Sequence, residues 1–304
     1  MVDGDSCLLL FNRQLTLDNR QFRWAFGGYH VGPHAILATA LTSQPTSTRQ
    51  DGQPRAHDPR ITVIQQELFA PGRSKARRYA DLVVGRGGLS ALLKYELIVT
   101  VCSALPGALG LLLRARLYPL LLGKTGRNVT FGVNVVLRHP HKIAIGDNVV
   151  IDDGCCLDAK GTDNRGITIG NGVFIGRNTI LSCKNGDIEV DDNANIGFNC
   201  EIFSGSRVRV GKNVLMAAYT YLVGGDHLYD RTDVPVLFQG RTARGIEVDD
   251  NAWLGAHVII ADGARVGRDV IVGAGAVVMD DVPPFQIVAG VPAKVMRDRR
   301  EGET

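Results

Sequence analysis

The sequence predicts a mainly β protein built around a three-sided parallel β-helix, and three observations lead to that fold class. Aliphatic residues recur every six positions from 129 to 283, a period that fits neither a helix nor a flat sheet. Six residues form one side of a coil in a solenoid of short repeats. The hexads come in threes, and insertions enter only after a third hexad. The leading positions are Ile145, Ile151, Leu157, Ile169, Ile175, Leu181, Val190, Ile196, Ile202, Val210, Met216, Leu222, Val248, Leu254, Ile260, Val266, Val272 and Val278.

The insertions predict where the loops lie. Between successive trios the spacing is 12, 9, 8 and then 26 residues in place of six. All four loops should therefore leave the coil at the same corner. Glycine and asparagine within the hexads suit tight corners, where φ is positive. Cys155 and Cys200 take the small fifth place of a hexad, so we expect them to be core residues.

Residues 1–72 form an N-terminal region whose role the sequence does not reveal. Strands are conceivable at 7–17 and 61–69, with a polar loop over 44–60. The histidines at 30, 34 and 57 show no metal-ligand spacing. The acidic start without a basic, apolar leader predicts a cytoplasmic protein. The six cysteines, which lack disulfide spacing, predict reduced thiols.

Residues 73–126 form a basic and apolar helical segment. From 71 to 127 there are ten Lys/Arg against two Asp/Glu, a net +8 in a chain whose total is only +3. The uncharged run over 97–113 is short for a membrane span and is broken by Pro106 and Gly107. Two interpretations stay open. Helices over 73–122 could lie in the inner membrane interface against anionic lipid, or they could cap the open end of the solenoid.

The repeat resembles the hexapeptide-repeat acyltransferases, nearest to the maltose, galactoside and polysaccharide O-acetyltransferases. The resemblance covers about 127–298 and leaves 299–304 as a tail. It implies a left-handed coil, a homotrimer with sites between subunits, and acetyl-CoA as co-substrate without a metal. The motifs that carry it are Leu222-Val-Gly-Gly-Asp-His227, Asn251-Ala-Trp-Leu-Gly-Ala256, Val272-Gly-Ala-Gly-Ala-Val277, Asp281-Val-Pro-Pro284 and Ala289-Gly-Val-Pro-Ala-Lys294.

His227 is the candidate catalytic base. It is the only histidine in the four corner loops, and imidazole titrates near neutral pH. A sugar hydroxyl becomes a good nucleophile only as it loses its proton, and a positioned base contributes about 10²–10⁴-fold to such a reaction. By resemblance, His227 takes the acceptor's proton and the oxygen attacks acetyl-CoA directly. Asp226 could orient the imidazole, although the choice of carboxylate stays open.

The resemblance also implies the remaining site residues. Backbone N–H groups near Gly255 and Ala256 would face the thioester and its oxyanion. Those small residues, together with Ala274, would let the pantetheine arm lie along the coils. Lys294 and Arg297 would meet the phosphates of CoA, and Asn199 would lie on the acceptor side. Trp253 is expected to pack beneath the active-site loop.

The predicted function is a CoA-dependent O-acetyltransferase acting on a carbohydrate, either a polysaccharide or a lipid-linked precursor. A sugar-nucleotide N-acyltransferase is the main alternative, because an amine can use the same base. A γ-type carbonic anhydrase would need three zinc-binding histidines, and His139, His141 and His257 lack the required spacing. A non-catalytic scaffold is a further alternative. Nucleic-acid binding is disfavoured because the basic residues interleave with aliphatics and not with aromatics.

Overall fold

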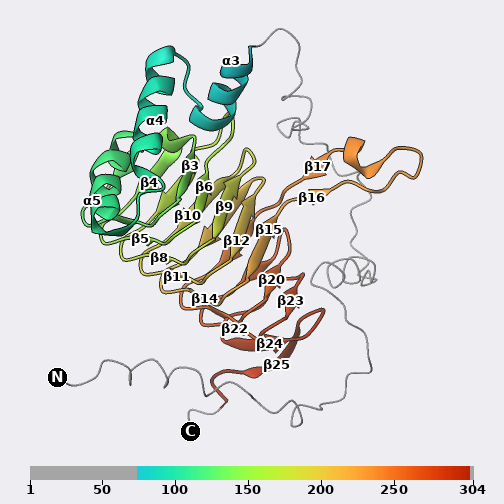
Figure 1. Cartoon of the computed structure of the whole chain (residues 1–304). Coiled ribbons are helices and arrows are strands. Elements are labelled where there is room, and N and C mark those ends of the chain that lie inside the picture. The colour runs from blue at the N-terminus through green and yellow to red at the C-terminus, as the bar shows by residue number, and fades with distance from the viewer. Residues whose placement is uncertain (1–73, 302–304) are drawn as a thin grey trace, which may run out of the picture. The chain divides into compact units, whose positions relative to one another are not determined.

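The structure is a computed structural model that describes residues 74–301. The strands considered at 7–17 and 61–69, the loop over 44–60 and the three histidines at 30, 34 and 57 lie outside the described residues. Within them, the chain forms a short helical segment followed by a parallel β-helix (Figure 1).

The β-helix has three sides, each a parallel sheet with one short strand from every coil. The first side is β1 (Lys124–Thr125), β4 (Ile143–Ile145), β7 (Ile167–Ile169), β10 (Asp187–Val190), β13 (Arg207–Val210), β18 (Ile246–Val248) and β21 (Arg265–Val266). The second is β2 (Thr130–Phe131), β5 (Val150–Ile151), β8 (Phe174–Ile175), β11 (Asn195–Ile196), β14 (Leu215–Met216), β19 (Trp253–Leu254), β22 (Ile271–Val272), β24 (Gln286–Ala289) and the antiparallel β25 (Lys294–Asp298). The third is β3 (Val136–Arg138), β6 (Cys156–Asp158), β9 (Ile180–Cys183), β12 (Glu201–Ser204), β15 (Tyr221–Gly224), β20 (Ile259–Ile260) and β23 (Val277–Val278).

The predicted trios are confirmed. Ile145, Ile151 and Leu157 lie in strands on the first, second and third side, and all three side chains are buried. Each leader pairs with the leader one coil further on, as Ile145 does with Ile169. The inward column is therefore a continuous stack of aliphatic side chains. Cys155 and Cys200 are buried in it, as expected.

All predicted loops leave at the corner between the third and the first side, which confirms the common edge. The segments 159–166, 184–186, 205–206 and 225–245 each join a third-side strand to a first-side strand. A further connection, with the 3-10 turn η3 (Pro140–Lys142), lies at the same corner. The β-helix starts at Lys124, slightly before the expected boundary at 127.

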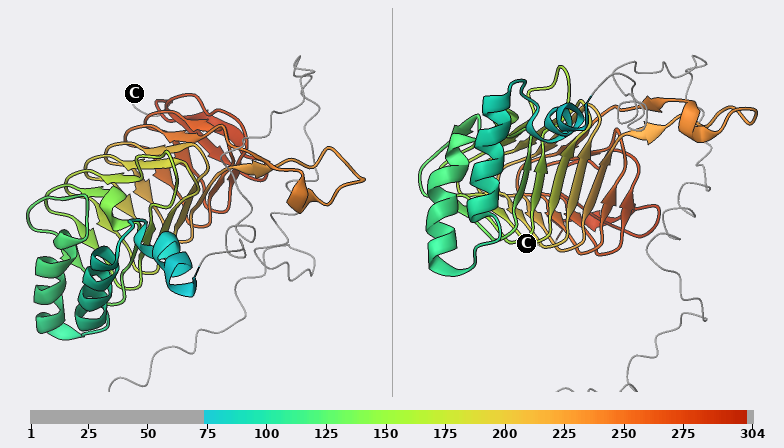
Figure 2. Two further views of the ribbon diagram at one scale, coloured as in Figure 1. Left: turned by 90° about the horizontal axis from the view of Figure 1, so that it is seen from above. Right: turned by 45° about the horizontal axis from the view of Figure 1, so that its top comes forward.

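The helical segment caps the first coil. It contains α3 (Lys75–Tyr79), the π-helix η1 (Ala80–Val84), α4 (Leu89–Cys102), α5 (Gly107–Leu117) and the 3-10 turn η2 (Tyr118–Leu120). Figure 2 shows α4 and α5 beside each other at the N-terminal end of the coils. The Tyr95 hydroxyl donates to the Leu137 carbonyl at 2.8 Å. The Tyr118 and Phe131 rings pack edge-on, with their centroids 5.3 Å apart. The capping interpretation is therefore confirmed.

Arg114 holds this cap to the coil. Its side chain is fully buried, and its partners are three backbone carbonyls, those of Phe131, Cys102 and Leu105, at 2.7–2.9 Å. Cys102 is the last residue of α4, where unpaired carbonyls carry the negative end of the helix dipole. A single guanidinium thus joins α5, the end of α4 and the first coil. No described helix is long and apolar enough to span a bilayer.

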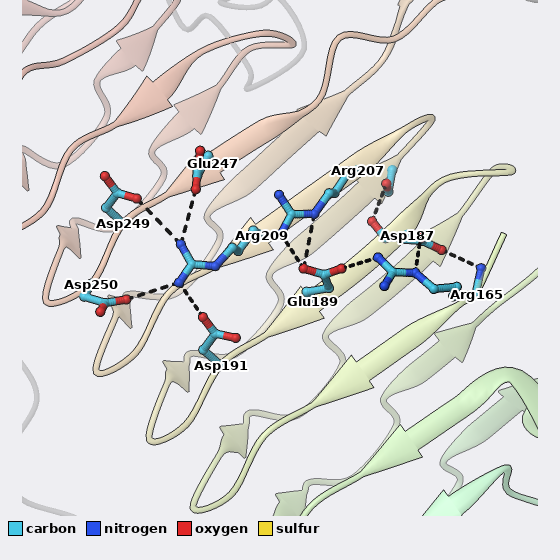
Figure 3. A network of polar contacts seen from close by, with 10 residues as sticks. Arg165, Asp187, Glu189, Asp191, Arg207, Arg209, Glu247, Asp249 and Asp250 are labelled. Atoms are coloured by element: carbon cyan, nitrogen blue, oxygen red, sulfur yellow. Dashed lines mark hydrogen bonds and ion pairs between the residues drawn. The ribbon is translucent and has the colours of Figure 1, made fainter.

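A network of ion pairs covers the outer face of the first side (Figure 3). Arg209 alone lies within 2.6–3.6 Å of carboxylates on Asp191, Glu247, Asp249 and Asp250. Its partners come from the coils before and after its own, so the network joins successive coils from the outside. A shared network of this kind stabilises the folded protein more than isolated surface ion pairs do. The charged first side contrasts with the second, where Val150, Leu215 and Trp253 are exposed.

Candidate active site

His227 lies on a two-stranded hairpin that extends from the loop corner. The loop 225–245 leaves β15 and pairs with itself through β16 (Asp226–His227) and β17 (Arg241–Thr242), with the 3-10 turn η4 (Val236–Phe238) between them. Figure 1 shows this hairpin projecting away from the coils. The antiparallel register sets His227 opposite Arg241. The hairpin therefore holds the imidazole at a defined place on the edge formed by all the loops.

The imidazole of His227 is half-buried and favours the neutral form. Burial lowers its pKa, and the positive charge of Arg241 lowers the pKa further, while Asp226 opposes both effects. Its Nδ1 atom is buried and has no hydrogen-bond partner among residues 74–301. A histidine that is neutral at pH 7 can accept a proton, which is the state a general base needs.

Asp226 positions the backbone of His227. Its Oδ1 accepts the His227 N–H at 2.8 Å, and no hydrogen bond joins this carboxylate to the ring within the described chain. Its effect on the imidazole is therefore electrostatic: its negative charge raises the pKa of His227. Arg241, which the sequence motifs do not indicate, is the other charged neighbour. Only the hairpin register reveals it.

Gly255, Ala256 and Ala274 gather at the corner between the second and third sides. A Cβ on Gly255 would lie 2.7 Å from the Ala274 nitrogen, so close packing of the coils alone requires glycine there. The Gly255 N–H already donates to the Val272 carbonyl at 2.8 Å. The Ala256 carbonyl accepts from Gly275, but within the described chain its N–H takes no part in the ladder between coils. Of the two expected oxyanion donors, Ala256 is the one whose N–H is outside that ladder.

Lys294 and Arg297 lie at the C-terminal end of the β-helix. Both are exposed on β25, which pairs antiparallel with β24, and Lys294 stands opposite Ala289. A Cβ on Gly273 would meet the Ala289 side chain at 3.1 Å. The register thus brings Lys294 near the coil that carries Ala274. Two cations beside a row of small residues suit an anionic nucleotide with a thin flexible arm.

Asn199 lies at the corner between the second and third sides, where the backbone conformation itself favours asparagine. Its φ is 53°, and Asn178 at the same place one coil earlier has φ 58°. In the next two coils this place is taken by Tyr219 and His257, with φ 61° and 58°. Bulky residues are uncommon in the left-handed region. Their exposed rings stack with centroids 4.8 Å apart and an interplanar angle of 3°, and sequence reasoning missed this pair.

Trp253 does not pack beneath the 225–245 loop, so that expectation is wrong. It lies on the outer face of the second side, where its register neighbours are Leu215 and Ile271, and its ring is exposed. The loop leaves from the opposite edge of the prism, because it follows a third-side strand. The Trp253 side chain points outward because of its position on a short strand. The sequence motif alone does not determine that direction.

The candidate residues fall into two groups on different corners. His227 and Asp226 follow a third-side strand, whereas Gly255 and Ala256 precede one. Crossing the third side from 256 to 261 takes five residue steps, or about 16 Å for an extended chain. Within one copy of the chain, the third side therefore separates the His227 imidazole from the small-residue corner, which is the corner that holds Gly255, Ala256 and Ala274.

Outside this site, residues 74–301 hold no preformed group of metal ligands, and burial sets the protonation of their thiols. Residues 74–301 contain no group of three or more His, Cys, Asp or Glu side chains placed to hold a metal ion. Burial raises the pKa of the Cys155 thiol to about 11, and it also raises the pKa values of Cys102, Cys156, Cys183 and Cys200. These thiols are protonated at neutral pH and are weak nucleophiles.

Comparison with known proteins identifies the repeat. Residues 245–279 match the bacterial transferase hexapeptide (six repeats) model, and residues 125–159 match the hexapeptide repeat of succinyl-transferase. The two matches lie near the two ends of the β-helix.

The curated relatives are acetyltransferases. The chain is 29% identical over 164 residues to a probable acetyltransferase of Mycobacterium tuberculosis, covering 54% of each chain. It is 32% identical over 117 residues to galactoside O-acetyltransferase of Escherichia coli, covering 37% of this chain and 54% of the relative. The chain thus spans about half the length of these relatives. An N-acyltransferase from Bacillus cereus, solved with dTDP and coenzyme A, aligns over 59% of this chain and 86% of its own at 24% identity and a TM-score of 0.43.

Proposed function

We propose that this chain, a hexapeptide-repeat protein with acetyltransferase relatives, transfers an acetyl group from acetyl-CoA to a hydroxyl of a carbohydrate. His227 is the general base. The single observation that carries the assignment is the half-buried imidazole, which the hairpin holds at the corner where the loops leave the coils. Burial and the charge of Arg241 lower the pKa of this imidazole.

The transfer is direct in this proposal. Neutral His227 takes the proton of the acceptor hydroxyl as its oxygen attacks the thioester carbonyl. The C–S bond then breaks, and the coenzyme thiolate leaves and takes up a proton. An oxyanion forms on the carbonyl in between, and the Ala256 N–H is the donor that can meet it. No acyl-enzyme on cysteine is needed, since burial keeps the described thiols protonated.

The active site is completed by a second copy of the chain. His227 follows the third side, and the small-residue row of Gly255, Ala256 and Ala274 precedes it. If a neighbouring copy placed the corner between its second and third sides against this hairpin, the two groups of residues would form one site. The resemblance to the hexapeptide-repeat acyltransferases implies a homotrimer, which would contain three such contacts between copies.

A sugar-nucleotide amine is the alternative acceptor, because deprotonation by His227 serves an amine equally well. The hydroxyl acceptor is preferred here because one of the curated relatives is a galactoside O-acetyltransferase. The discriminating measurement is which class of acceptor, hydroxyl sugar or amino sugar nucleotide, supports CoA release.

The test is release of free CoA from acetyl-CoA over a panel of sugars, amino sugar nucleotides and lipid-linked glycans. With an active acceptor, His227→Ala should lower kcat by about 10²–10⁴-fold, because the base is lost. Asp233→Asn, on the exposed tip of the same loop, is the matched control and should retain the activity. Normal turnover by His227→Ala would remove histidine from the mechanism. Equal losses in both variants would indicate a loop defect instead.

A further inference from the structure

The helical cap has a second apolar face that the β-helix does not use. Tyr95, Ile98 and Cys102 form the buried side of α4. On its other side, Leu89, Leu93 and Leu97 are 70%, 58% and 67% exposed, and Val101 continues the row. Residues four apart drift by only roughly 40° around a helix, so these form one stripe. The buried set lies on the opposite side of the helix. α4 is thus apolar on two faces, of which one is covered.

The neighbouring helix extends this exposed face. Arg114 and Gly110 are the buried residues of α5, and the Arg114 side chain reaches the first coil. Leu109 and Leu112 lie on the other side and are 61% and 53% exposed. Because α4 and α5 lie side by side and both bury one side against the coil (Figure 2), their other sides face away from it together. The result is a double row of leucines at one end of the described structure.

Basic residues border this face. Residues 74–127 contain nine Lys/Arg against Asp81 and Glu96, a net charge of +7. Arg86 is exposed just before α4 begins, and Arg116 is exposed one turn beyond Leu112. Lys94 donates to the Leu120 carbonyl at 2.6 Å, which leaves its charge at the surface of the helix pair. Exposed leucines edged by cations, on helices lying along the end of a domain, match the chemistry of an anionic bilayer surface.

We propose that the face formed by Leu89, Leu93, Leu97, Val101, Leu109 and Leu112 docks onto an anionic lipid bilayer. The leucines enter the headgroup boundary, and Arg86 and Arg116 contact the lipid phosphates. The attachment is peripheral in this proposal, because the leucines enter only as far as the headgroup boundary. The cap keeps its hold on the first coil through Arg114 and Tyr95 while its outer side meets lipid. The inference is independent of the acetyl transfer proposed above.

Vesicle flotation of the full chain tests the docking face. The protein should float with vesicles that contain phosphatidylglycerol and much less with pure phosphatidylcholine. The double variant Leu93→Glu/Leu97→Glu should lose binding by roughly tenfold or more, because charge enters the apolar face. Met296→Glu is the matched control, since Met296 is also 67% exposed but lies on β25. It should bind like the unchanged protein.

A second pair of variants tests the electrostatic part without disturbing the apolar face. Arg86→Gln/Arg116→Gln should weaken binding to the anionic vesicles by about thirtyfold, and Lys212→Gln, on an exposed corner of the β-helix, should not. Absence of flotation by the unchanged chain, or equal flotation by all variants, would overturn the proposal. So would a drop in oligomer mass by light scattering for Leu93→Glu/Leu97→Glu without lipid, because a second copy would then cover the face.

Discussion

His227 has two charged neighbours with opposite effects on its pKa. Arg241 stands opposite it in the hairpin register and lowers its pKa, whereas Asp226 precedes it and raises the pKa. Burial of the ring adds to the effect of Arg241. The neutral, proton-accepting form therefore persists at lower pH than it does for free imidazole. The position of the imidazole and the charge of its neighbours together decide whether this residue can act as a base.

The pH profile of the reaction should report this balance. The rate should fall on the acidic side as His227 becomes protonated, with a midpoint below the usual histidine pKa. Arg241→Gln removes a positive charge, so it should raise the pKa and move the acidic limb to higher pH. Asp226→Asn removes a negative charge and should move the limb the other way. Steady-state kcat/KM against pH measures both shifts, and identical profiles for all three proteins would exclude His227 as the titrating group.

At the scale of elements, the helical cap depends on one buried cation. Arg114 donates to three carbonyl groups: one on the last residue of α4, one in the linker between α4 and α5, and one on the first coil. Gly110 lies one turn earlier, where a Cβ would sit 1.8 Å from the Leu105 carbonyl oxygen. Close contact between α5 and the linker that precedes it therefore requires glycine at this position.

Replacement of Arg114 should loosen the cap. Arg114→Leu leaves three buried carbonyl oxygens without their donor, so we expect a loss of about 3 kcal/mol in the free energy of unfolding. Urea denaturation followed by circular dichroism measures it. Arg116→Leu on the same helix replaces an exposed arginine and should change the stability little. Equal stability of the two variants would show that Arg114 does not hold the cap.

At the scale of the whole described molecule, the three sides of the prism differ in chemistry. The first side carries the ion-pair network around Arg209 (Figure 3), and the second exposes apolar side chains such as Trp253. The third side separates the histidine hairpin from the small-residue corner. Because the parts of the proposed site stand on different corners, the proposed mechanism requires that several copies of the chain assemble.

Mixing two inactive variants should restore activity. His227→Ala lacks the base, and Ala274→Trp places a bulky ring where the pantetheine arm would lie, so each alone should be inactive. In a trimer formed at equal amounts, one in four contacts between copies combines an intact His227 with an intact Ala274, so about a quarter of the normal rate should return. Co-expression with two different tags, followed by the CoA release assay, measures it. A site contained in a single chain would give no recovery.

The six-residue period by itself determined the three-sided coil, the aliphatic core and the common edge of the loops, because stacked leaders such as Ile145 and Ile169 can be buried only in that register. It also singled out His227 as the one histidine of those loops. Only the tertiary structure decided which charges surround His227, where Trp253 points and that one face of the helical cap is already occupied by the first coil. These properties depend on contacts between segments far apart in the sequence, such as Arg114 with Phe131 or His227 with Arg241. A local repeat cannot encode such contacts.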